Sequence, residues 1–135
     1  MEIFLTVVGE YLAEIGAEVT IDLYTDFEIT DPVASLLFTE LRQSALQQNN
    51  TATAGIRRND PYMGVPLDLT SSKDRNYFSH LAHRTIGSEA SLERKLIFST
   101  IENERIVCMD VPDKEAEMIA SRALQAGATT LSRVS

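Results

Sequence analysis

The chain has very little cysteine: Cys108 is the only one in 135 residues. A single cysteine excludes an internal disulfide. The β-prone run around it, with Val107 and Met109 on either side, predicts a buried and unreactive thiol within a strand. Because a chain without disulfides is typical of a reducing compartment, we expect a cytoplasmic protein.

Long apolar runs are also missing. No apolar stretch approaches the ~20 residues that are needed to span a bilayer. Residues 1–8 are apolar, but they contain no basic residue and no small-residue cleavage site, so they make a poor signal peptide. We therefore expect no membrane partner.

Basic residues are scarce in the first part of the chain. Residues 1–50 contain nine acidic side chains and a single basic one, Arg42, so this third carries a charge equal to the whole net charge of −8. Residues 51–95 have a small excess of basic side chains, and the remainder has a small excess of acidic ones. An acidic surface repels phosphate backbones, so nucleic acid is not an expected partner.

The chain does contain enough apolar residues to form a core. At 135 residues, 44% hydrophobic and 24% charged, it has the composition of an ordinary soluble domain. We expect one domain over residues 1–135, with an acidic part at 1–50 and a second part at 51–135.

Helical periodicity marks the acidic part. Residues 2–15 place apolar side chains on one stripe and glutamates opposite, which predicts a helix. The β-branched residues at 3–8 are also compatible with a strand, but the helical pattern persists over all fourteen positions. Alternation predicts a strand at 18–24. Asp31 followed by Pro32 is a helix start, so a second helix is expected from there to about residue 46.

Residues 55–73 are rich in glycine, proline and other turn-forming residues. Loops of this length are typically functional or disordered. A weak strand is expected near 51–57 or 65–70. A short helix is expected to begin at residue 74 or 76 and end at 85, and residues 87–91 are interpreted as a connection.

The residues from 95 onward show the clearest pattern. Two alternating runs, 95–101 and 105–111, predict an antiparallel hairpin. Pro112 suits the first turn of a helix, the acidic residues after it favour the helix N-terminus, and Gly127 lies where a cap is expected. The β-prone residues 129–134 predict a last strand.

Together these elements predict an α+β fold, a mainly antiparallel sheet with helices packed on it. From about residue 51 the expected order is βαββαβ, which is the ferredoxin-like arrangement. An α-β-α extension precedes this core.

Two groups of side chains have ligand-binding chemistry. Arg57, Arg58 and Lys73 belong to the 55–73 loop, where arginines can hold a phosphate or carboxylate through paired hydrogen bonds. His80 and His83 are three residues apart in the expected helix, so both imidazoles can face one metal ion. A metal site requires further ligands, and the sequence has no second cluster of histidine or cysteine.

The loop also carries large apolar side chains. Tyr62 and Met63 lie in it, and Arg75 and Tyr77 follow in the next helix. These residue types are common anchors of protein interfaces. The alternative is that the apolar side chains fold down and cover the core.

We expect a small regulatory or interaction module, without catalytic residues or a cofactor, that binds another protein or itself. The alternative is a sensor that holds a small anionic ligand, such as a phosphate or nucleotide, in the 55–73 loop. A third hypothesis is a metal-assisted hydrolase that uses His80 and His83.

Overall fold

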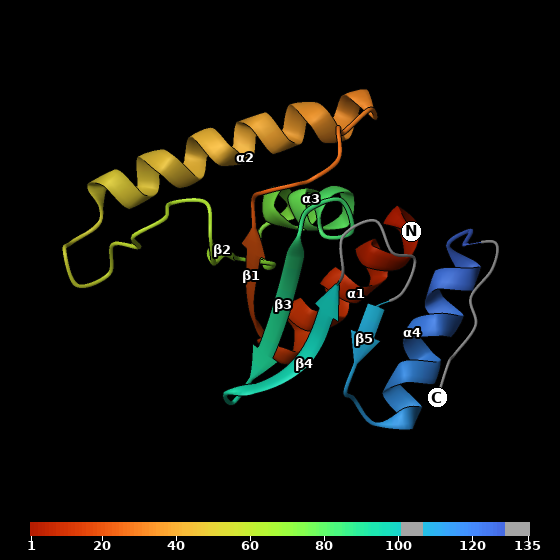
Figure 1. The fold of residues 1–135 in the computed structure, drawn as a ribbon. Coiled ribbons are helices and arrows are strands. Elements are labelled where there is room, and N and C mark those ends of the chain that lie inside the picture. The colour runs from red at the N-terminus through yellow and green to blue at the C-terminus, as the bar shows by residue number, and fades with distance from the viewer. Residues whose placement is uncertain (101–106, 129–135) are drawn as a thin grey trace.

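A computed structural model describes residues 1–100 and 107–128 of the chain. The described residues form a five-stranded antiparallel sheet and four helices (Figure 1). The elements in chain order are α1 (Glu2–Ile15), β1 (Glu18–Asp22), α2 (Pro32–Thr51), β2 (Val65–Leu67), α3 (Ser72–Leu81), β3 (Gly87–Leu92), β4 (Lys95–Thr100), β5 (Val107–Met109) and α4 (Asp113–Gln125). The α+β class expected from the sequence is therefore confirmed.

The strands lie in the order β2-β1-β3-β4-β5, and every neighbouring pair is antiparallel. This order does not confirm the ferredoxin-like arrangement. Residues 87–91, which we interpreted as a connection, belong to β3 and pair with both β1 and β4. The interpretation was wrong because Gly87 and the serines resemble a turn, whereas pairing on both edges holds them extended.

Further expectations concern the strands of residues 51–135. Residues 51–57 form no strand, and the strand appears at β2, within the second expected range. The turn of the expected hairpin and the last expected strand, at 129–134, lie outside the described residues. The paired strands β4 and β5 confirm the hairpin's two arms, and α4 begins directly after Pro112 as expected.

The two faces of the sheet differ in polarity. Val19, Ala90 and Phe98 are partners across β1, β3 and β4, and all three are buried. The opposite face carries Glu89 and, in the edge strand β5, Cys108, and both side chains are exposed. The expectation of a buried thiol was therefore wrong, because strand alternation places Cys108 on the uncovered face.

Helix α1 confirms the helical interpretation of residues 2–15. Leu5, Val8 and Leu12 recur at helical spacing and are almost completely buried. The helix ends at Gly16, whose positive φ of 72° is readily adopted only by a residue without a side chain. The periodicity thus sets the buried face of the helix, and Gly16 sets its end.

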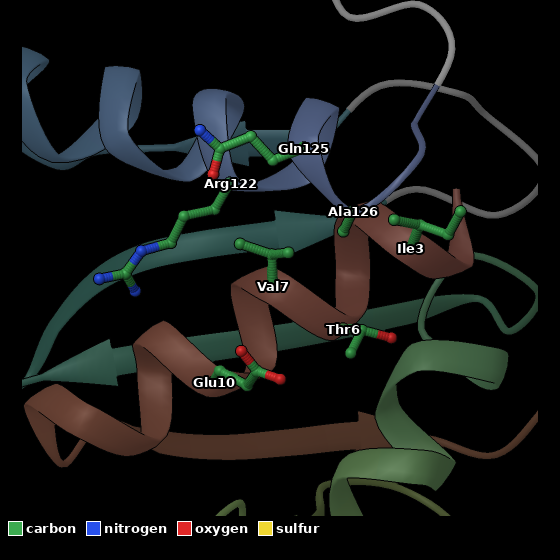
Figure 2. Close-up of a pocket in the computed structure, with 7 residues that line it drawn as sticks. All are labelled: Ile3, Thr6, Val7, Glu10, Arg122, Gln125 and Ala126. Carbon is green, nitrogen blue, oxygen red and sulfur yellow. The ribbon is translucent and has the colours of Figure 1, made fainter.

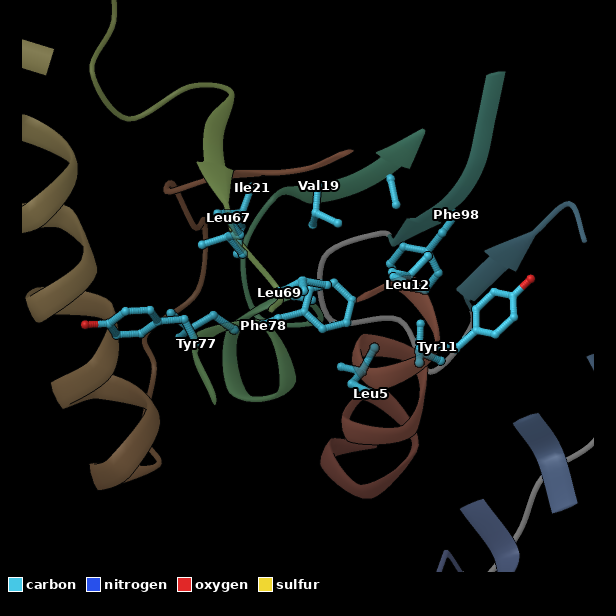
Figure 3. Close-up of a cluster of buried hydrophobic side chains, with 14 of the residues drawn as sticks. Leu5, Tyr11, Leu12, Val19, Ile21, Leu67, Leu69, Tyr77, Phe78 and Phe98 are labelled. Carbon is cyan, nitrogen blue, oxygen red and sulfur yellow. The ribbon is translucent and has the colours of Figure 1, made fainter. Parts of the chain in front are cut away.

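The core lies between α1, α3 and one face of the sheet (Figure 3). Phe78 of α3 is fully buried at its centre, and its ring centroid is 5.6 Å from that of Phe98 in β4. Gly9 of α1 allows this approach, because a Cβ at that position would be 3.3 Å from the Phe78 ring. The two helices can therefore pack closely over the sheet.

Helix α2 packs against α3 and is capped at its N-terminus by a side chain. Asp31 caps its N-terminus by accepting a hydrogen bond from the Ala34 N–H at 2.9 Å. The helix lies along α3 and extends past the β2 edge of the sheet (Figure 1). Its buried residues follow a single stripe: Ala34, Leu41, Ala45 and Asn49. The opposite side of α2 consequently faces solvent. No helix within the described residues is long and apolar enough to cross a membrane.

Candidate functional site

Arg42 of α2 is surrounded by aromatic rings. The carbon of its guanidinium group lies 4.0 Å from the ring centroid of Tyr62 and 5.5 Å from those of Tyr24 and Phe38. Cations over aromatic faces are attracted by the ring quadrupole, so this cage stabilises the charge without a counter-ion. Beside it lies a hollow of about 280 Å³ lined by Phe38, Thr39, Arg42, Gln43, Leu46 and Tyr62.

The Nε atom of Arg42 is buried and has no hydrogen-bond partner among the described residues. The nearby carboxylate of Asp60 is already used, since it accepts hydrogen bonds from the Tyr24 hydroxyl at 2.7 Å and from the Tyr62 N–H at 2.9 Å. These bonds hold the pKa of Asp60 below its usual value and raise that of Tyr24. Asp60 therefore positions the two tyrosines and makes no ion pair with Arg42.

A second hollow, of about 520 Å³, lies between α1 and α4 (Figure 2). Ile3 and Val7 of α1 and Ala126, which follows α4, form its apolar part, and Glu10 and Arg122 are its charged residues. Arg122 lies 3.7 Å from Glu14, so its charge is already partly balanced. This groove has an apolar surface but no unsatisfied polar atom of the kind found at Arg42.

The basic residues expected to hold an anion are engaged within the chain. Arg57 donates from Nη2 to the carbonyl oxygens of Asn50 and Ala52, both at 3.1 Å, at the end of α2. Arg58 donates to the Pro61 carbonyl at 3.0 Å, although its own Nε is buried without a partner. The Lys73 ammonium group lies 3.7 Å from Glu40. All three side chains are thus held by groups of the chain itself.

The residues expected at an interface are divided between core and surface. Tyr77 is 2% exposed, and its hydroxyl donates to Glu40 at 2.8 Å. Arg75 donates to the carbonyls of Leu69 and Thr70, which fixes the turn before α3. Tyr62 is half-buried against Arg42, and Met63 is exposed. Only Met63 of this set is freely presented to solvent.

The two histidines lie at the end of α3 and just after it, near the ion pair of Glu2 with Arg84. His80 lies in α3, where its Nδ1 is 3.0 Å from the Asn76 carbonyl and 3.3 Å from the Ser79 hydroxyl. His83 follows the helix, and its Nδ1 is buried without a partner. No group of three or more metal-ligating side chains occurs in the part of the chain that the structure describes.

His83 is expected to make stability depend on pH. Burial, followed by the charge of Arg84, lowers the pKa of His83 from 6.5 to about 4. Between these values the unfolded chain binds a proton that the folded chain does not, so stability must fall as the pH is lowered through this window. We expect the urea concentration at the unfolding midpoint to decrease as the pH is lowered from about 6.5 to about 4. The decrease should be steeper in the native protein than in His83→Gln.

The matched control for this prediction is His80→Gln, which removes a histidine from the same segment but leaves His83 in place. It should retain the pH slope of the native protein. An identical slope in His83→Gln and the native protein would show that His83 is protonated equally in both states.

The chain matches no protein-family model, no curated protein and no solved structure. The function must therefore be inferred from the arrangement of its own residues. Sequence reasoning missed Arg42 as a site residue, although one signal pointed to it: Arg42 is the only basic residue among the first fifty.

Proposed function

We propose that the protein is a non-enzymatic interaction module that associates with itself through the outer side of α2. The observation that carries this proposal is a line of four exposed residues on that side: Leu36, Thr39, Gln43 and Leu46. We call them the α2 stripe. Leu36, the fifth residue of α2, is 67% exposed, and Leu46 is 38% exposed.

The spacing of the α2 stripe suits a helical partner. Its residues are three, four and three positions apart, which is the spacing of the seam between packed helices. The stripe is also self-complementary. In an antiparallel pair of α2 helices related by a two-fold axis, Leu36 would face Leu46 of the second copy and Thr39 would face Gln43, twice over.

Charge supports the same partner. The chain carries a net charge of −8, so two copies repel one another over most of their surfaces. Within α2, Glu40 and Arg42 are the only charged residues, and neither belongs to the α2 stripe. This helix is thus a surface on which two acidic molecules can meet without placing like charges directly opposite.

The contact would be small. Helix α2 has 20 residues and is about 30 Å long. A single pair of such helices buries less than the roughly 1,600 Å² of a standard interface, so the association should be weak. We expect a dissociation constant between about 10 µM and about 1 mM.

Leu36→Glu tests this proposal. It places two new carboxylates in the apolar part of the proposed contact, so the dimer seen by sedimentation equilibrium or native mass spectrometry should be lost. The melting temperature should stay unchanged, because Leu36 makes little contact with the core. Leu124→Glu is the matched control, since Leu124 is a 50% exposed leucine on α4.

A native protein that remains monomeric at about 1 mM would contradict self-association. Equal loss of the dimer in Leu36→Glu and Leu124→Glu would assign the effect to added negative charge and not to the α2 stripe.

A further inference from the structure

The geometry around Arg42 points to a binding site for the carboxylate of a small organic acid. This inference goes beyond self-association, because it does not require a second copy of the chain. Thr39, Gln43 and Leu46 of the α2 stripe also line the hollow, so a ligand and a second copy would compete for this surface. None of the sequence-predicted residues Arg57, Arg58 and Lys73 lines this hollow. Four features of the hollow support it: the free cation, the fixed orientation of that cation, the apolar walls and the single charge.

The cation is available to a ligand. Among the described residues, the Arg42 side chain makes no hydrogen bond and no ion pair, and its Nε is buried. Apart from Nε, a guanidinium group has four N–H donors on its two Nη atoms, and no described residue accepts a hydrogen bond from those of Arg42. A carboxylate can satisfy two of these donors at once through parallel hydrogen bonds.

The aromatic rings hold the guanidinium group in place before a ligand binds. The Tyr62 ring centroid lies 4.0 Å from the guanidinium carbon and those of Tyr24 and Phe38 lie 5.5 Å from it, so the three rings limit the movement of the group. The Tyr24 and Tyr62 rings are themselves held edge to face, with centroids 6.0 Å apart, and are tied to Asp60. Because the arginine is already ordered, little conformational entropy is lost when a ligand binds.

The walls define the rest of the ligand. Phe38, Leu46 and Tyr62 give the hollow apolar surface, while Thr39 and Gln43 provide side-chain hydrogen-bonding groups. Its volume of about 280 Å³ is close to the lower end of small-molecule sites, which begins at roughly 300 Å³. A compact acid with one flat or branched apolar group has the matching size and polarity.

The charge favours a monoanion. Arg42 is the only cation among the residues that line the hollow, and Asp60 lies close to the same rings. Residues 1–50, which include most of α2, carry eight excess negative charges. A doubly charged phosphate would be repelled by these carboxylates, whereas a single carboxylate is matched by one guanidinium group.

Isosteric probes test the site in the native protein. We expect sodium benzoate to raise the melting temperature, with a stabilisation that grows as RT ln(1 + [L]/Kd), and to shift the amide NMR signals of Thr39, Gln43 and Tyr62. Benzamide has the same shape without the charge and should bind at least tenfold more weakly. Equal binding of benzamide, or signal shifts confined to other parts of the chain, would overturn the inference. Inorganic phosphate that bound as tightly as benzoate would overturn the choice of a monocarboxylate.

Two substitutions identify the anchoring residue. Arg42→Gln should abolish the response to benzoate, and Arg42→Lys should weaken binding at least tenfold, because lysine keeps the charge but loses the planar fork. Lys114→Gln on α4 is the control for net charge and should bind benzoate as the native protein does. Unchanged affinity in Arg42→Lys would exclude paired hydrogen bonding. If Arg42→Gln does not fold, the comparison of benzoate with benzamide still decides the question.

Discussion

Phe78→Ala is expected to lower the free energy of unfolding by about 3–5 kcal/mol, the largest effect of any single change considered for this protein. Phe78 is 0% exposed and lies between α1 and the sheet, where it contacts Phe98 and covers Gly9. Its removal loses the transfer free energy of the ring and leaves a cavity that the surrounding backbone cannot close. Urea denaturation followed by circular dichroism measures the change.

Phe27→Ala is the matched control for the Phe78 substitution. Phe27 is 61% exposed, so the same chemical change should alter stability by less than about 0.5 kcal/mol. A cost for Phe78→Ala as small as that for Phe27→Ala would mean that α3 does not pack against the sheet through this ring.

Thr100→Val is expected to cost about 2–4 kcal/mol, although it conserves volume. The buried hydroxyl of Thr100 donates to the Ala82 carbonyl at 2.6 Å and accepts from the Ser88 N–H at 3.1 Å. It therefore joins the end of β4 to the end of α3 and to β3. Valine would leave two buried backbone groups without a partner, and each such group costs about 1–3 kcal/mol. The same urea titration measures this loss.

Thr100→Ser separates the hydroxyl from the methyl group. Serine keeps both hydrogen bonds, so it should lose less stability than valine even though it removes a buried carbon. If Thr100→Ser is the more destabilising of the two, packing of the methyl group dominates at this position and the hydrogen bonds contribute little.

The local elements were well predicted where a regular pattern continued for several turns or matched a capping signal. The helical periodicity of residues 2–15 predicted α1, and Asp31 with Pro32 predicted the start of α2. Prediction failed for β3, because its serines and Gly87 have low strand propensity and the strand is stabilised by pairing with β1 and β4. The pairing partners are distant in sequence, so the pairing cannot be predicted from the residues of β3 alone.

The candidate site was less predictable. The sequence predicted an anion site at the basic residues of the 55–73 loop. In the structure, Arg57 donates hydrogen bonds to carbonyl groups at the end of α2, and Lys73 lies beside Glu40. Tyr77 was expected at an interface and is buried, with its hydroxyl bonded to Glu40. Residue type alone cannot distinguish an arginine that binds a ligand from one that caps its own backbone.

The sequence by itself determined the α+β class, the amphipathic face of α1, the cap of α2 and the surplus of acid in the first third. Each depends on residues close together in the chain, through periodicity, capping or composition. Only the tertiary structure decided the order of the strands, the exposure of Cys108 on an edge strand and the aromatic cage around Arg42. The cage joins Tyr24, Phe38 and Tyr62 from three separate segments, and such proximity arises only when long-range packing brings those segments together.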